Sequence, residues 1–229
     1  MREAIVLAGG FGTRLRSEVS DVPKPLAPVR GTPFVCYVLD YLASAGFRHV
    51  VLSTGYMHEK IESALGENYA GLELSYAVEE VPLGTGGGML WALQQCKEDV
   101  VTVVNGDTLF RADLLALADS HERRQAELSV MLRSVSDASR YGRVEMDGDG
   151  RIVRFAEKSA VSAPGLINGG IYCLCRSLFD DFQPGSAFSF ERDVMQAFVD
   201  KRRFYGMESD GYFIDIGIPE DYRRAQQEL

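Results

Sequence analysis

The sequence predicts an α/β fold with a Rossmann-like, mixed but mostly parallel sheet, helices on both faces, and a single domain. The first half of the chain alternates short apolar runs with segments of helical periodicity, which is typical of βαβ crossovers. The second half carries closely spaced strand patterns of the kind that pair antiparallel. No linker, repeat or low-complexity tract separates the halves, so the 229 residues are expected to share one core.

The elements follow from these patterns in order. In the first half, strands are predicted over 3–8, 49–53, 72–78 and 99–105. Helices are predicted over 34–45, 58–65, 86–96 and 112–124. In the second half, strand patterns cover 126–134, 142–158, 166–176, 203–206 and 212–216. The string DGDG after Met146 predicts a hairpin turn, because glycine supplies positive φ there. A helix is expected over 191–199, and another begins at Pro219, since proline suits a first helical position.

The composition excludes some partners. A net charge of −9 argues against a nucleic-acid backbone or an anionic membrane as partner, because both need a basic face. The four cysteines have no CxxC spacing, which favours reduced thiols over a zinc site. The apolar run before Gly9 is too short for a signal peptide or a membrane span, so we expect a cytoplasmic protein.

The stretch LAGGFGTRLR places Gly9, Gly10 and Gly12 directly after a predicted strand. A dinucleotide site would need a G-x-G-x-x-G/A pattern and an acidic residue after the second strand, and neither is present. No GxxxxGK[ST] string occurs, which excludes a P-loop. A plain turn without a ligand is the alternative to a loop whose backbone N–H groups point at phosphate oxygens.

Two cations accompany the glycines. Arg14 follows the loop and could neutralise charge on a transferring phosphoryl group, unless it is an ordinary surface arginine. Lys24 stands between Pro23 and Pro25, which stiffen the segment and aim the side chain. A solvated lysine would gain nothing from that stiffness.

The strings LAGGFGTRLR and PKPLAPV together resemble the signature of the sugar-1-phosphate nucleotidyltransferases, over essentially the whole chain. This resemblance implies the nucleotide-diphospho-sugar transferase fold. It also implies a reaction of a nucleoside triphosphate with a sugar 1-phosphate that yields a nucleotide-sugar and pyrophosphate. Residues 1–110 would mainly bind the nucleotide and residues 111–229 the sugar phosphate. No residues remain for an additional C-terminal module, so a stand-alone transferase is expected.

Asp107 and Asp215 each follow an apolar strand pattern, which presents a carboxylate at the edge of a sheet. The resemblance places both on Mg²⁺, a cation that accepts one or two carboxylates together with phosphate oxygens and water. Either aspartate could instead bond its own backbone in a strand-end turn. Their separation in sequence is too long for spacing to show that they meet. By resemblance, Arg14 contacts the triphosphate and Lys24 the phosphates near the reacting centre, so Arg14, Lys24 and Asp107 are the expected catalytic residues.

The remaining nucleotide contacts involve the glycine loop and the string VPLGTGGG. Each glycine in a helix interior destabilises the helix by about 1 kcal/mol. A run of three therefore indicates close approach of a base or ribose, or else a flexible hinge. If Glu80 lies at the base edge, its carboxylate could accept hydrogen bonds from guanine N1–H and N2–H. The expected nucleotide-binding residues are Leu7, Ala8, Gly9, Gly10, Gly12, Thr13, Arg14, Glu80, Gly84, Thr85, Gly86 and Asp107.

The resemblance extends to the sugar side through YGRVEMD, FAEKS and LINGGIYCL. Glu191 would add a further acid there, although an acid at a helix start is also favoured by the helix dipole. Members of the family often carry E-K-P, whereas Ser159 follows Lys158 here, which puts the placement of the sugar in question. The expected sugar-phosphate-binding residues are Lys24, Gly142, Glu157, Lys158, Asn168, Gly170 and Glu191.

Within the family, SDVPKPLAPV, VEEVPLGTGGG and the chain length look most like short guanylyltransferases acting on D-glycero-α-D-manno-heptose 1-phosphate or on mannose 1-phosphate. Short uridylyltransferases for amino-sugar 1-phosphates, including N-acetylmuramate 1-phosphate, share many of these features and remain the alternative. An NAD(P)-binding oxidoreductase or a non-catalytic nucleotide-sugar sensor would not need Arg14, Lys24, Asp107 and Asp215 together. We expect nucleoside triphosphate and sugar 1-phosphate as partners, and a homodimer as a further possibility.

Overall fold

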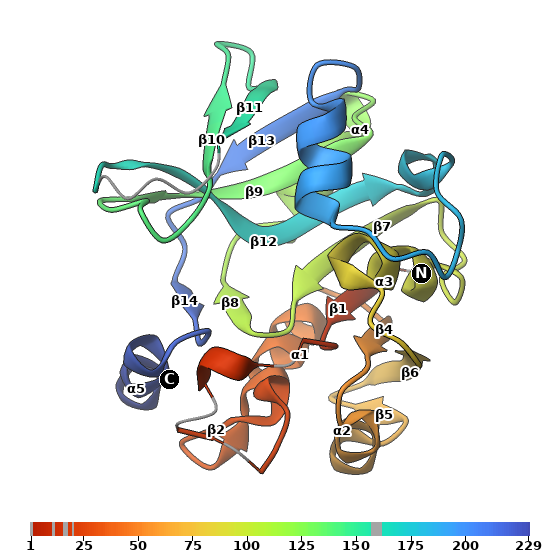
Figure 1. The fold of residues 1–229 in the computed structure, drawn as a ribbon, viewed down its shortest axis with the longest axis vertical. Coiled ribbons are helices and arrows are strands. Elements are labelled where there is room, and N and C mark those ends of the chain that lie inside the picture. The colour runs from red at the N-terminus through yellow and green to blue at the C-terminus, as the bar shows by residue number, and fades with distance from the viewer. Residues whose placement is uncertain (1, 11, 16–17, 20, 157–161) are drawn as a thin grey trace.

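The computed structural model of the protein describes residues 2–10, 12–15, 18–19, 21–156 and 162–229. Its main sheet has the strand order β11-β10-β12-β7-β1-β4-β6-β5, and β9 joins β12 to β13 (Figure 1). The adjacent strands of the first half run parallel. They are β1 (Glu3–Leu7), β4 (His49–Thr54), β6 (Leu72–Val78) and β7 (Val100–Asn105). The predicted mixed, mostly parallel α/β sheet is therefore confirmed.

The second half extends this sheet with antiparallel pairing. β12 runs antiparallel to both β7 and β9, whereas β13 returns parallel to β9. The predicted hairpin turn is present: Oδ1 of Asp147 accepts hydrogen bonds from the N–H groups of Asp149 and Arg151, and Gly150 has φ +79°. The strands of this half are β9 (Leu128–Val135), β10 (Arg143–Met146), β11 (Ile152–Ala156), β12 (Gly165–Cys175) and β13 (Phe204–Glu208). At the other edge of the sheet, the short β5 (Asn68–Tyr69) of the first half pairs antiparallel with β6.

Helices cover both faces of the sheet, because consecutive strand residues point to opposite sides. Ala4 and Val6 of β1 join one core with Phe34, whereas Ile5 joins the other core with Met89. The helices that pack on the first core are α1 (Phe34–Ser44), α2 (His58–Leu65), α4 (Leu114–Arg123) and α5 (Pro219–Glu228). Those on the second are α3 (Gly84–Leu93) and a π-helix (Phe190–Gln196).

The π-helix lies where the sequence predicts a helix over 191–199. Ser189 caps its start, since its hydroxyl accepts a hydrogen bond from the N–H of Arg192 and its own N–H donates to Asp193. π-Helical turns are uncommon and occur often at functional sites. Short elements that the sequence did not predict complete the fold. They are β2 (Pro28–Val29), β3 (Thr32–Pro33) and the 3₁₀ turns Thr13–Leu15, Lys24–Leu26 and Arg176–Phe179.

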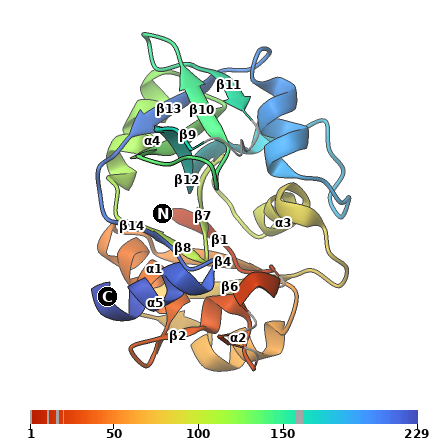
Figure 2. The same ribbon diagram turned by 60° about the vertical axis from the view of Figure 1, so that its left-hand side comes forward.

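A separate two-stranded ladder ties the end of the chain to its middle. β14 (Phe213–Asp215) runs antiparallel to β8 (Thr108–Phe110), and α5 follows directly (Figures 1 and 2). The rings of Phe110 and Phe213 meet edge to face with their centroids 5.4 Å apart. This ladder returns the last strand to the point where β7 ends.

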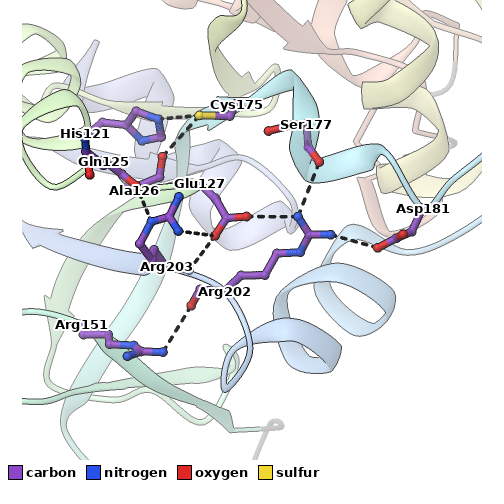
Figure 3. Close-up of polar contacts among 10 residues, drawn as sticks. All are labelled: His121, Gln125, Ala126, Glu127, Arg151, Cys175, Ser177, Asp181, Arg202 and Arg203. Atoms are coloured by element: carbon purple, nitrogen blue, oxygen red, sulfur yellow. Dashed lines mark hydrogen bonds and ion pairs between the residues drawn. The ribbon is translucent and has the colours of Figure 1, made fainter.

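A polar cluster fastens β13 to the start of β9 (Figure 3). Glu127 accepts hydrogen bonds from the backbone N–H of Arg203 at 3.0 Å and from the guanidinium of Arg202 at 3.1 Å. Burial opposes ionisation of Glu127, but these hydrogen bonds outweigh it and lower the pKa of the carboxyl group. Arg202 also pairs with Asp181, so one guanidinium joins three segments.

Candidate active site

A cavity of about 600 Å³ opens at the carboxyl ends of the parallel strands. Leu7 and Asn105, the last residues of β1 and β7, both line it. Open α/β sheets bind ligands at this edge, and the volume lies within the range of small-molecule sites. The other lining residues are Gly9, Gly10, Ser53, Gly55, Tyr56, His58, Val78, Glu79, Glu80, Pro82, Gly84, Thr85, Gly88, Asp107 and Glu191.

The glycine loop forms one wall of this cavity. Gly9 and Gly10 line it, and a Cβ added at Gly10 would meet no heavy atom within 4 Å. Gly12 has φ +58°, and a Cβ there would lie 3.0 Å from Cβ of Lys24. The loop therefore needs glycine at Gly12 both for its backbone conformation and for its close approach to Lys24.

Three other predicted residues belong to the loop region. Ala8 is buried, and its N–H donates to the carbonyl of Ser53 at 2.8 Å. Arg14 lies in the 3₁₀ turn Thr13–Leu15, where its side chain is exposed and outside the lining of the cavity. Thr13 contributes its backbone to the same turn.

Lys24 lies against Asp107, a lining residue, whereas neither Lys24 nor Asp215 is itself among the residues that line the cavity. The side chain of Lys24 is 10% exposed, and its Nζ lies 2.5 Å from Oδ2 of Asp107 and 3.8 Å from Oδ1 of Asp215. The preceding Pro23 has φ −65° and ψ 151°, the extended conformation expected before the turn that contains Lys24. The two predicted carboxylates and the predicted lysine are thus brought together.

The β8–β14 ladder explains this meeting. Asp215 pairs with Thr108, the residue after Asp107, and the N–H of Ile216 donates to the carbonyl of Asp107 at 3.0 Å. Because the register is fixed by backbone hydrogen bonds, both carboxylates are held against the same ammonium group.

The electrostatics of the cluster favour a further cation. Burial and the negative charge of Asp107 raise the pKa of Asp215, whereas Lys24 and the N–H of Gly217 oppose this rise. Two carboxylates share one ammonium, so the cluster carries more acid than base. Among the described residues no group of three or more His, Cys, Asp or Glu side chains could hold a metal. Two carboxylates nevertheless fit Mg²⁺, which takes its remaining ligands from substrate phosphates and water.

Gly217 is a residue of this cluster that the sequence analysis missed. Its N–H donates to Oδ1 of Asp215 at 2.7 Å. A Cβ at this position would lie 2.8 Å from that oxygen and 3.1 Å from Nζ of Lys24. The string IDIG contains the glycine, but only the folded structure shows that it packs against both charged groups.

Two glycines of α3 pack closely against the segment that precedes the π-helix. A Cβ at Gly86 would lie 2.3 Å from the ring of Phe188, and one at Gly87 would lie 2.4 Å from the carbonyl oxygen of Ser186. At these two glycines the close approach is to the polypeptide before the π-helix, whereas Gly88 of the same helix lines the cavity. Gly86 is absent from the cavity lining, whereas Gly84 and Thr85 belong to it.

Two adjacent acids lie at the cavity, where the sequence analysis singled out only Glu80. Glu80 is exposed. Glu79 is partly buried and fixed, because Oε1 accepts a hydrogen bond from Ser53 at 3.1 Å and Oε2 accepts one from the N–H of Leu83 at 2.9 Å. The pair VEEV contains no signal that separates the two acids, since the choice depends on how the segment turns after β6.

The predicted sugar-side residues divide into three groups. Glu191 lines the cavity, and its Oε2 accepts a hydrogen bond from the hydroxyl of Thr85 at 2.7 Å. Asn168 is half-buried and bonds Tyr172 and the N–H of Gly170, so it organises the bulge in β12. Gly142, Asn168 and Gly170 are not among the lining residues, and Glu157 and Lys158 fall outside the described residues.

The fold and the cavity are those of a nucleotidyltransferase. The chain belongs to the nucleotidyl transferase family, whose model matches residues 3–229. It is 45% identical over 99% of its length to the D-glycero-alpha-D-manno-heptose 1-phosphate guanylyltransferase of Aneurinibacillus thermoaerophilus, and covers 98% of that protein. It is 38% identical over 99% of its length to the mannose-1-phosphate guanylyltransferase of Mycobacterium tuberculosis, of which it covers 64%.

A solved structure agrees with these relatives. The crystal structure of HddC from Yersinia pseudotuberculosis complexed with GMP-PN has a TM-score of 0.87 and 33% identity to this chain. The match covers 100% of this chain and 99% of that one. Nucleotidyl transferases generally use a divalent metal, in agreement with the paired carboxylates. Within the described residues, no helix has the length and apolar character needed to cross a membrane.

Proposed function

We propose that this enzyme transfers a guanylyl group from GTP to D-glycero-α-D-manno-heptose 1-phosphate and releases pyrophosphate. The observation that carries the transfer chemistry is the cluster of Lys24, Asp107 and Asp215, which reaches the cavity through Asp107. The relative from Aneurinibacillus thermoaerophilus, which aligns with nearly the whole chain, supports the choice of sugar.

The reaction joins two anions, so the site must reduce their repulsion and align them. An oxygen of the sugar phosphate attacks the α-phosphorus of the triphosphate, and the bond from that phosphorus to the pyrophosphate oxygen breaks. The buried ammonium of Lys24 would stabilise the negative charge that develops on the phosphoryl oxygens. Its position beside Gly12 places it next to the loop whose N–H groups would bind the phosphates.

Asp107 and Asp215 would hold Mg²⁺. When bound, this ion would neutralise phosphate charge and orient the triphosphate. Asp107 lines the cavity, and Asp215 is held beside it by the N–H of Gly217. We assign Arg14 to the triphosphate and the leaving pyrophosphate; its exposed side chain would have to turn toward the phosphates when they bind.

Glu79 supports GTP as the nucleotide. In the described part of the chain no lysine, arginine or histidine forms an ion pair with this carboxylate. The negative charge of Glu79 would repel phosphate groups, so we assign this carboxylate to the nucleoside end of the cavity. Each carboxylate oxygen accepts one hydrogen bond from the protein and has a second lone pair free. Guanine offers N1–H and N2–H as adjacent donors, whereas uracil offers a single N–H on its pairing edge.

On the sugar side, we propose that Glu191 accepts a hydrogen bond from a sugar hydroxyl. Gly142, Asn168 and Gly170, which lie outside the lining of the cavity, stay predicted contacts of the sugar phosphate. Glu157 and Lys158 would contact the sugar and its phosphate. Residues 1–110 would then mainly bind the nucleotide and residues 111–229 the sugar phosphate. The same proposal places the enzyme in the cytoplasm, where nucleoside triphosphates are available. The homodimer stays a prediction, which light scattering can check.

A substrate matrix tests the proposal. The four nucleoside triphosphates are each combined with heptose, mannose, glucose and N-acetylmuramate 1-phosphates in the presence of Mg²⁺, and pyrophosphate release is measured. GTP with the heptose 1-phosphate should give the highest kcat/KM. Lys24→Ala should lose activity by a factor of about 100 or more and keep the fold. A preference for UTP, or full activity of Lys24→Ala, would contradict the assignment.

A further inference from the structure

The start of α3 and the segment before the π-helix are joined by a dense set of hydrogen bonds. The N–H of Phe188 donates to the carbonyl of Leu83 at 2.9 Å. The carbonyl of Phe188 accepts in turn from the N–H groups of Gly86 at 3.1 Å and Gly87 at 3.3 Å. These N–H groups at the start of α3 are therefore capped by protein, and they are not available to a phosphate.

The hydroxyl of Thr85 completes this junction from inside the cavity. It accepts a hydrogen bond from the N–H of Phe190 at 2.9 Å and donates one to Oε2 of Glu191 at 2.7 Å. The proton and one of the two lone pairs of the hydroxyl are thus engaged by the protein, so the hydroxyl has no proton left to donate to a nucleotide. Thr85 instead fixes the first two residues of the π-helix against the first turn of α3.

This arrangement determines which oxygen of Glu191 can meet a substrate. Oε2 accepts from both Thr85 and Ser189, the latter at 3.0 Å. Among the described residues, Oε1 accepts no hydrogen bond, and Glu191 lines the cavity. The carboxylate therefore has one oxygen held by the protein and one left for a substrate hydroxyl.

The same turn is also fixed from the nucleotide side. The N–H of Leu83, two residues before Thr85, donates to Oε2 of Glu79. A short chain of hydrogen bonds thus runs from the acid proposed to read the base, through the start of α3, to the acid proposed to bind the sugar. Through such contacts, a shift of Glu79 in the nucleotide subsite can alter the position of Glu191 in the sugar subsite.

We propose that Thr85 is a positioning residue that sets the carboxylate of Glu191 for the sugar phosphate. This inference rests on the proposed function, because it takes the hydroxyl donor at Glu191 to be that of the sugar. Because its proton is donated to Glu191, the hydroxyl of Thr85 serves this carboxylate rather than the nucleotide. Loss of its hydroxyl raises KM for the sugar phosphate and leaves KM for GTP unchanged.

The experiment compares Thr85→Val, which keeps the shape and removes the hydroxyl, with Thr85→Ser, which keeps the hydroxyl. Thr85→Val should raise KM for the sugar 1-phosphate about tenfold, as expected for one hydrogen bond to a charged group, with KM for GTP within a factor of two. Thr85→Ser should stay near wild type in both constants. An increase confined to KM for GTP would overturn the proposal.

A double-mutant cycle separates positioning from general damage. If Thr85 acts through Glu191, Thr85→Val should add no further increase in KM for the sugar phosphate when Glu191 is already alanine. If the two substitutions raise KM for the sugar phosphate independently, so that their factors multiply, the proposal is overturned. If Thr85→Val does not fold, Thr85→Ala enters the same cycle. If the substrate matrix identifies another pair than GTP and heptose 1-phosphate, the proposed function fails alone, and the cycle is measured with that pair.

Discussion

The ammonium group of Lys24 lies 2.5 Å from a carboxylate oxygen of Asp107, although 83 residues separate the two in sequence. Asp215 approaches the same ammonium at 3.8 Å. A lysine that is 10% exposed and shared by two acids is fixed in position, because it has little freedom to point elsewhere. Consequences for activity and stability follow from this cluster and from two other buried groups.

Asp215→Asn should lower kcat/KM by about 100-fold at moderate Mg²⁺, because one of the two carboxylates proposed to hold the metal becomes neutral. Activity should recover in part as the Mg²⁺ concentration rises, which an initial-rate titration measures. Asp119→Asn, an exposed acid on α4, is the matched control and should behave as wild type. An unchanged metal dependence in Asp215→Asn would remove this residue from the metal site.

Gly217→Ala should lower kcat by tenfold or more, because the added Cβ would displace Asp215 or Lys24 from their present positions. The thermal midpoint should change little, since the strain is local to the loop before α5. The control is Gly148→Ala, at a glycine where a Cβ would meet nothing within 4 Å. If both alanine variants keep full activity, the close packing around Gly217 has no role in catalysis.

Glu79→Gln should raise KM for GTP about tenfold or more, because the amide replaces one acceptor by a donor that faces the guanine N–H groups. In this variant the increase in KM should be smaller for inosine triphosphate, which lacks the N2 amino group, than for GTP. Glu80→Gln provides the neighbouring control and should keep KM within a factor of two. The reverse result, with Glu80→Gln impaired and Glu79→Gln normal, would restore the expectation from the sequence.

His121 predicts how stability depends on pH. Burial lowers the pKa of His121 to about 4, and its ring nitrogens contact Ser129 at 3.0 Å and Cys175 at 3.4 Å. In the unfolded chain the pKa is about 6.5, so the unfolded state binds more protons between these values. The free energy of unfolding should therefore fall as pH drops through this window, by about 2 kcal/mol between pH 7.5 and 5.

Urea unfolding at several pH values measures this effect, and His121→Gln is the comparison. The variant should start from a lower stability and lose the part of the slope that the histidine contributes. Equal slopes in the two proteins would show that another group controls the pH dependence. Glu3 and Glu127 have lowered pKa values, so their contributions should be lost mainly at lower pH.

Much of the fold was predictable because its signals are local. The helix over His58–Leu65 and the strand over Leu72–Val78 match the predicted bounds, since each is set by the periodicity of its own apolar residues. The hairpin turn before Arg151 was equally local, because glycine and aspartate fix its conformation. The motif around Arg14 and Lys24 likewise sufficed to identify the family.

What the sequence could not show depends on contacts between distant segments. The meeting of Asp107 with Asp215 requires the register of β8 against β14, and three-residue strands have too little pattern to reveal their partner. The packing of the α3 glycines against Phe188 could not be predicted either, because no local signal links the two segments. Glu79 and Glu80 could not be separated either, since both are acids in the same turn.

The β8–β14 ladder has a consequence for shortened forms of the protein. One of its two proposed metal ligands lies close to the end of the chain, and the strand that carries it must return to the middle of the protein. A nascent or truncated chain that stops before Phe213 would retain the parallel strands and the glycine loop, and it would still lack Asp215 and Gly217. Such a fragment should bind nucleotide without turning it over, so a binding assay alone would not reveal that it is inactive.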